Sequence, residues 1–402
     1  MSTPTPTPGS TSRASDRVQP ATMGPADELL DPRRRELITM LSHVMDVSVI
    51  DSIGWACLWF ADLSVIEALT KAAEQSPWTN LARSALSKDD SRTTAIRAWA
   101  VRAGSEDSGE PSEDEATETD ESPTKKRRLN PDPRRTTKIP KWIGIQSAER
   151  PLGASSVKTS SSIGARSLSM EETARRAEKL CKERDHDICI LTGCSLPVEV
   201  AHIFPRSLGK KGAEGVKDFW NALECFWTPQ QVEAWKEQVL GPDGVETCSN
   251  LMCMTNLAHE LWEKAVFALK PLSLSEDKRQ LQVQLYWLPM NKYRRTMSVT
   301  AAPEPFPRNL SSTNDTYKTW LWNMATHTRV CSGDILTFKT DDPVGHPLPS
   351  MELLNMQWIL HRVLALSGAA NATNKELSPG HAFGVYEEDS DWNSEMEVEE
   401  EE

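Results

Sequence analysis

Four residues in the middle of this 402-residue chain have the types and the spacing for hydrolytic chemistry: His202, Asn250, His259 and Glu263. A neutral histidine can take a proton from water near pH 7, and His202 lies in the apolar run VEVAHIF. His259 and Glu263 are four apart in a helical pattern, so their side chains leave the same helix face. An imidazole and a carboxylate at that spacing can bind one divalent cation. Phosphodiester hydrolysis requires a base and such a cation.

A short strand is expected to position the first histidine. Residues 198–204 are rich in β-branched and apolar side chains and are followed by Pro205, which predicts a strand that stops there. Side chains alternate along a strand, so Glu199 and Ala201 should face one way and His202 the other.

A helix is expected to position the second histidine. Thr255 or Asn256 can cap it, because their side chains can accept a hydrogen bond from the first backbone N–H groups. Beyond them apolar residues recur at helical spacing: Leu257, Leu261 and Ala265, beside Trp262 and Val266.

The order His, Asn, His in its flanking text (CILTG, AHIFP, FW, NL, HELWE) resembles the signature of HNH nucleases, which have a ββα-metal fold. The text is similar to that of a subfamily found in many copies in fungal genomes. The resemblance implies an endonuclease that cleaves DNA with a divalent metal ion, with Mg²⁺, Mn²⁺, Ni²⁺ and Zn²⁺ left open. It implies that His202 is the general base and that His259 is a metal ligand. Asn250 would fix the loop between the strands or assist the metal.

Two features depart from the usual HNH pattern. Many members have Asp or His as a metal ligand just before the base, whereas this chain has Ala201, so Glu263 or a water would have to fill that position. The stretch between His202 and Asn250 is also long, because it includes FWNALECFWTPQQVEAWKEQVLG. In the fungal subfamily, Ala before His is usual, and the resemblance covers roughly residues 171–370. The alternative is an HNH fold retained as a nuclear binding or scaffold module with weak or no catalysis.

The cysteines allow two interpretations. Cys189 and Cys194 are five apart, as are Cys248 and Cys253, and the two pairs bracket the motif. Some HNH proteins carry a structural zinc on two flanking cysteine pairs, and four thiolates bind zinc tetrahedrally. Those pairs usually have two intervening residues, whereas each pair here has four. Buried free thiols in a reducing compartment are the favoured interpretation.

Charge is unevenly distributed along the chain. The net charge is −13, but residues 106–121 hold 9 acids and residues 387–402 hold 10, so the remainder carries +6. Most of that positive surplus comes from one basic cluster: Lys125, Lys126, Arg127 and Arg128, with Arg134 and Arg135 beyond. Such a cluster is typical of a nuclear import signal, which an import receptor would bind. The chain is therefore expected in the nucleus, with the cytoplasm as the alternative.

The presumed folded parts of the chain are close to neutral. Nucleic-acid enzymes usually present a basic face, so the charge of the folded parts favours the binding-module alternative.

Composition divides the chain into five segments. A Pro/Ser/Thr-rich tail is expected at 1–28, a small all-α module at 29–103, a disordered acidic and basic linker at 104–166, the HNH-like domain with a C-terminal extension at 167–370, and an acidic tail at 371–402. The fold class is therefore α+β: a ββα-metal core with helical insertions and extra strands. No apolar run approaches the length of a membrane span.

The remaining patterns predict elements around the motif. Ser169 and Glu172 form a capping box for a helix that reaches about His186. Two helices are expected in the Trp-rich insertion, the second starting at Thr228-Pro229, and their aromatic side chains are more typical of a core than of base stacking. Strands are expected at 281–288 and 334–340, and an amphipathic helix at 351–365 that ends near Gly368.

Overall fold

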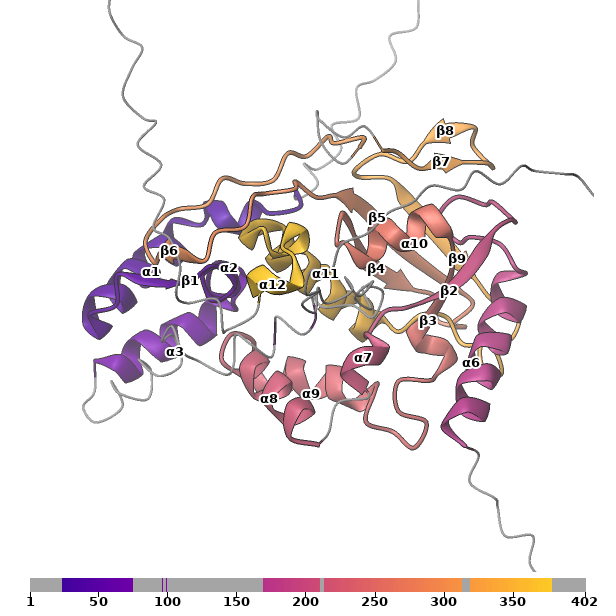
Figure 1. Cartoon of the computed structure of the whole chain (residues 1–402), viewed down its shortest axis with the longest axis horizontal. Coiled ribbons are helices and arrows are strands. Elements are labelled where there is room, and N and C mark those ends of the chain that lie inside the picture. The colour runs from indigo at the N-terminus through magenta and orange to yellow at the C-terminus, as the bar shows by residue number, and fades with distance from the viewer. Residues whose placement is uncertain are drawn as a thin grey trace, which may run out of the picture. The chain divides into compact units, whose positions relative to one another are not determined.

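The computed structural model describes residues 24–74, 96, 99, 169–209, 213–312 and 319–377. The chain divides into two units, residues 1–104 with 168–402 and residues 105–167, and every element below belongs to the first unit. Figure 1 shows helices together with several small antiparallel sheets, which agrees with the expected α+β class. The predicted linker, with its basic cluster at Lys125–Arg128, and most of the two predicted tails lie outside the described residues.

Short helices make up most of the described N-terminal part of the chain; they are the 3-10 helix η1 (Asp27–Leu30), α1 (Pro32–Met45), α2 (Ser52–Phe60) and α3 (Leu63–Ala73). Aspartates begin two of them: the Asp31 side chain accepts the N–H of Arg33, and the Asp51 side chain accepts that of Ile53. The predicted tail at 1–28 was set too long, because Ala26 is buried and η1 already begins at Asp27.

The N-terminal part is not purely α-helical, so the predicted all-α module at 29–103 needs correction. Strand β1 (Val49–Asp51) pairs antiparallel with β6 (Thr296–Ser298), a partner that no local sequence pattern could indicate. Every residue of α2 is buried, and α2 packs against the long helix α11 (Met351–Ser367), which the short helices η3 (Ala369–Asn371) and α12 (Asn374–Leu377) follow. The N-terminal helices therefore belong to the same hydrophobic cluster as the strands and helix that follow the motif.

Within the part of the chain that the structure describes, no single helix is long and apolar enough to cross a membrane. Helices α2 and α3 pass that test only as a pair, and they are bent by 112° relative to each other. Every residue of α2 is buried, whereas the buried residues of α3 are Ile66, Thr70 and Ala73.

His202 ends the first of two antiparallel strands, Asn250 ends the 3-10 helix η2 (Cys248–Asn250) before the second strand, and His259 lies on the helix that follows. Strand β2 (Val198–His202) pairs with β3 (Leu251–Thr255), so that His202 lies opposite Leu251. Helix α10 (Asn256–Glu263) follows β3 directly, and its predicted cap is confirmed because Thr255 Oγ1 accepts the N–H of Ala258. The helix is shorter than its apolar pattern suggested: Ala265 has φ +50°, a left-handed conformation that does not continue an α-helix.

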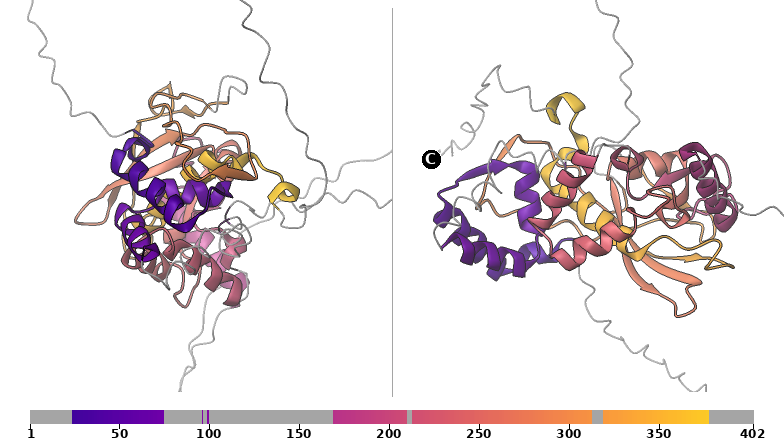
Figure 2. Two further views of the ribbon diagram at one scale, coloured as in Figure 1. Left: turned by 90° about the vertical axis from the view of Figure 1, so that its left-hand side faces the viewer. Right: turned by 90° about the horizontal axis from the view of Figure 1, so that it is seen from below.

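A three-stranded antiparallel sheet and one long helix form the support behind the motif. Strands β4 (Phe267–Leu274), β5 (Gln280–Trp287) and β9 (Ile335–Lys339) lie in the order β4-β5-β9. The predicted strands at 281–288 and 334–340 are thereby confirmed, whereas β4 was missed. Helix α11 packs on β4 and ends at Gly368, as predicted. The right-hand view of Figure 2 shows α11 between the N-terminal helices and these strands. A separate hairpin joins β7 (Trp322–Asn323) to β8 (Thr328–Arg329).

The helices before and within the insertion follow the sequence closely. Helix α6 (Met170–Asp185) begins with the predicted capping box between Ser169 and Glu172. The insertion folds as α7 (Arg206–Gly209), α8 (Ala213–Glu224) and α9 (Pro229–Glu237). Its aromatic residues are core, as expected: Trp220 stacks on Phe204 at 5.7 Å between ring centroids. This packing attaches the insertion to the segment directly after His202.

Candidate functional site

His202, the last residue of β2, is held by a buried carboxylate. Its Nε2 lies 3.2 Å from Oε2 of Glu246, and the two side chains are 16% and 7% exposed. The other carboxylate oxygen of Glu246 forms an ion pair with Arg206 Nε at 2.8 Å. The hydrogen bond with His202 keeps the pKa of Glu246 below its usual value, although burial acts in the opposite direction. An ionised Glu246 can accept a hydrogen bond from Nε2–H, which leaves Nδ1 as the ring nitrogen that can take a proton.

Glu246 therefore links folding stability to pH. Its pKa is lower in the folded protein than in the unfolded chain, so the stabilisation is present above the unfolded value of about 4.3 and is lost as pH falls through the folded value. We expect wild-type protein to be more stable than Glu246→Gln at neutral pH, with a difference that shrinks below about pH 4. Urea unfolding of both proteins across this range measures it. A difference independent of pH would contradict the ionised state of Glu246.

Asn250 connects the end of β2 to the loop before β3. Its side chain is fully buried; Oδ1 accepts the N–H of Phe204 at 2.7 Å, and Nδ2 donates to the carbonyls of Phe204 at 3.2 Å and Val245 at 2.9 Å. Its backbone carbonyl accepts the N–H of Ile203 at 2.8 Å. With both amide protons donated to backbone carbonyls and no exposed surface, Asn250 has the contacts of a positioning residue that fixes the backbone beside His202.

His259 on α10 lies between two carboxylates. Its Nδ1 is 2.8 Å from Oε2 of Glu199 on β2, and its Nε2 is 3.4 Å from Oε1 of Glu263 one turn along the helix. The Glu199 contact favours a proton on Nδ1, which leaves Nε2 as the nitrogen available to a cation. Two ligands of one tetrahedral ion at about 2.1 Å lie about 3.4 Å apart, so Nε2 and Oε1 fit a shared divalent cation.

The two histidines lie on opposite faces of the β2–β3 pair. Glu199 and Ala201 face α10, as the His259 contact and the burial of Ala201 in the main cluster show. Val198 and Val200 pack on the other face, from which the His202 side chain also leaves. Trp262 connects the two sides, since its Nε1 donates to the backbone carbonyl of His202 at 3.1 Å. Ala201 offers no donor atom toward α10, and the carboxylate on that face is Glu199.

The four cysteines considered for zinc are not brought together. Cys189 is buried in the main hydrophobic cluster and Cys194 is half-buried, whereas Cys248 and Cys253 belong to a second, smaller cluster beside α6. Among the described residues, no group of metal-binding side chains includes Cys189, Cys194 or Cys248.

Sequence reasoning did not assign Glu246 or Glu199 to the site. Glu246 lies in the irregular segment before Asn250, where no periodic pattern indicates a partner. Strand alternation placed Glu199 opposite to His202, but only the packing of α10 on β2 shows that it contacts His259.

The described residues therefore place a histidine paired with a buried carboxylate at the end of β2 and a His–Glu pair on α10. Residues 189–270 match the family model described as HNH endonuclease, and the match contains His202, Asn250 and His259. This part of the chain is therefore similar to the HNH endonuclease family, as its sequence indicated. No curated protein and no solved structure shows significant similarity to the chain.

Proposed function

We propose that the protein is a divalent-metal-dependent endonuclease that hydrolyses phosphodiester bonds in DNA. The observation that carries this proposal is the His202–Glu246 pair, which stands at the end of β2 inside the HNH match. Strands β2 and β3 and helix α10 follow one another in the order of the ββα-metal fold, and the cation would lie on the α10 side.

In the proposed mechanism, His202 Nδ1 accepts a proton from the attacking water. Glu246 accepts a hydrogen bond from Nε2–H, orients the ring and stabilises the imidazolium that forms when Nδ1 takes the proton. Asn250 fixes the backbone directly after His202 through Ile203 and Phe204.

The residues of α10 would hold the cation. His259 Nε2 and Glu263 Oε1 supply two ligands, and Glu199 orients the His259 ring from behind. The bound cation would neutralise charge that develops on the phosphate and the leaving oxygen. Because Ala201 contributes no donor, water or substrate oxygens are left to complete the coordination.

A plasmid-nicking assay of the full chain tests the proposal. We expect conversion of supercoiled DNA to nicked circles in at least one of Mg²⁺, Mn²⁺, Ni²⁺ and Zn²⁺, and none in EDTA. A single-stranded RNA of matched length serves as the substrate control. Folded protein that cleaves neither nucleic acid in any of these metals would overturn the proposal. DNA binding without cleavage would instead support the scaffold alternative, which Ala201 at a usual ligand position favours.

The metal ligands predict a change in metal requirement. Glu263→Gln should raise the metal concentration that gives half-maximal cleavage at least about tenfold, because a neutral amide replaces a carboxylate ligand. Glu260→Gln is the matched control: Glu260 lies on the same helix but is exposed and pairs with Lys264. Cleavage is titrated against metal for both variants. Equal requirements in the two would remove Glu263 from the cation site.

A further inference from the structure

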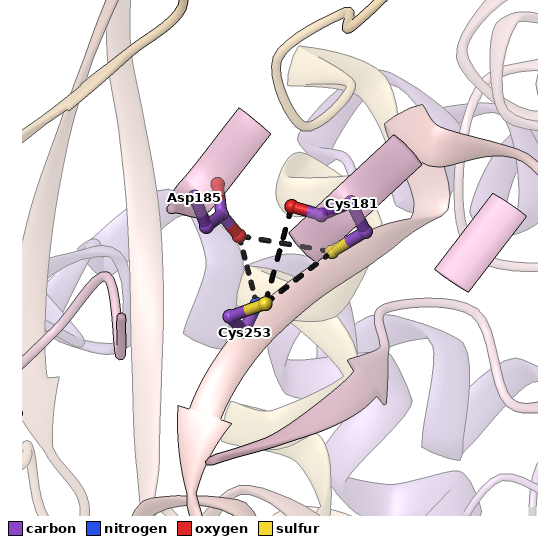
Figure 3. A group of neighbouring side chains, drawn as sticks. All are labelled: Cys181, Asp185 and Cys253. Atoms are coloured by element: carbon purple, nitrogen blue, oxygen red, sulfur yellow. Dashed lines mark hydrogen bonds between the residues drawn. The ribbon is translucent and has the colours of Figure 1, made fainter. Parts of the chain in front are cut away.

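A second group of metal-binding side chains lies on the far side of β3 from α10. Cys181 and Asp185, one turn apart on α6, project toward Cys253 on β3 (Figure 3). Cys181 and Cys253 are buried, and they belong to a small hydrophobic cluster with Ala177, Cys248 and Leu251. Two of the three residues come from a helix that precedes the HNH match.

We propose that Cys181, Asp185 and Cys253 bind a structural zinc ion that joins α6 to β3. The Sγ atoms of Cys181 and Cys253 are 3.9 Å apart, and Cys181 Sγ is 3.7 Å from Asp185 Oδ2. In a tetrahedral zinc site with bonds of about 2.3 Å to sulfur and 2.0 Å to oxygen, two sulfurs lie about 3.8 Å apart and a sulfur and an oxygen about 3.5 Å apart. The side chains therefore already stand at the spacing that the ion requires.

The charges around the three residues suit a divalent ion. Arg184 is buried beside them and pairs with Asp185 at 2.7 Å. Its guanidinium also donates to the backbone carbonyls of Cys248, Leu251 and Pro347. Two thiolates and one carboxylate carry three negative charges, which one zinc ion and one guanidinium balance. Replacing the two thiol protons by zinc thus leaves the net buried charge unchanged, and avoids the cost of an uncompensated buried charge.

Cys248 belongs to the same small hydrophobic cluster, but it is not part of this group of metal-binding side chains. Its Sγ is 3.5 Å from Nη1 of Arg184, while Cys181 Sγ is 3.5 Å from Nη2 of the same guanidinium. A water would therefore supply the fourth ligand of a site with these three protein donors.

The site would fix the strand pair that carries His202. Asp185 Oδ2 accepts the backbone N–H of Cys253 at 2.9 Å, and Cys253 pairs with Val200 across the β2–β3 ladder. A zinc ion bound there would hold α6, β3 and, through the ladder, β2 in one arrangement. It lies on the face opposite to Glu199, so it is distinct from the cation proposed for α10.

The full chain carrying His259→Ala is the starting protein, so that the α10 site does not contribute metal. After purification it should contain about one zinc per chain, and Co²⁺ exchanged for zinc should give the intense near-ultraviolet absorption of thiolate-bound cobalt. Cys181→Ser and Cys253→Ser should each lose this absorption. Cys189→Ser is the matched control, because Cys189 is equally buried but lies in the other cluster, and it should keep the absorption.

X-ray absorption at the zinc edge provides a test that needs no cysteine variant. It should show at least two sulfur neighbours at about 2.3 Å in the folded His259→Ala chain. Folded protein that neither contains zinc nor takes up cobalt would overturn the proposal. Cobalt absorption that persists in Cys181→Ser would also overturn it. So would a disulfide between Cys181 and Cys253 in protein prepared under reducing conditions. None of these outcomes depends on nuclease activity.

Discussion

Replacing His202 with alanine should lower the rate of DNA cleavage by about 10²–10⁴-fold, the usual contribution of a positioned general base. The expectation rests on the contact with Glu246, which holds the ring in one orientation and supports the charge that the ring gains. The rate is measured with saturating metal and substrate, so that a change in binding does not affect it.

His346→Ala is the matched control for this experiment. His346 forms the same type of pair, with Nε2 at 3.2 Å from Glu183 Oε2, at a site outside the HNH match. We expect its cleavage rate to equal that of the wild-type protein. If His202→Ala cleaves as fast as His346→Ala, His202 is not the general base.

The largest expected effect on stability comes from Asn250→Ala. The substitution removes three hydrogen bonds and leaves the N–H and carbonyl of Phe204 and the carbonyl of Val245 without their side-chain partner in a buried site. At about 1–3 kcal/mol for each unsatisfied buried group, partly relieved by local rearrangement, the free energy of unfolding should fall by about 3–5 kcal/mol.

Asn371→Ala supplies the comparison. Asn371 is exposed and its side chain donates a single hydrogen bond, to the carbonyl of Asn291, so its loss should cost at most about 1 kcal/mol. Urea unfolding of both variants and of the wild-type protein gives the difference. Similar values for the two variants would mean that Asn250 does not fix the backbone around β2.

Local sequence patterns predicted the elements that carry the site. The alternation and Pro205 predicted β2, Thr255 predicted the start of α10, and Ser169 with Glu172 predicted the start of α6. These succeeded because strand alternation and helix capping are decided by residues a few positions apart. The HNH resemblance supplied the identity of the domain, which the family match confirms.

Contacts between distant parts of the chain could not be predicted in the same way. Glu246 is 44 residues from His202, and Glu199 is 60 residues from His259. Strand β4 was missed because its short apolar start, directly after α10, is equally compatible with a helix. The cysteines show the same limit: spacing suggested Cys189 with Cys194, whereas packing places Cys253 beside Cys181 on a helix that comes earlier in the chain.

The burial of α2 against α11 bears on which part of the chain can fold by itself. The family match covers only residues 189–270, yet the core behind it includes side chains from the N-terminal helices and from α11. A gene fragment that carried the matched stretch alone into another protein would leave those apolar surfaces uncovered. The matched stretch therefore depends on both of its flanks to complete its hydrophobic core.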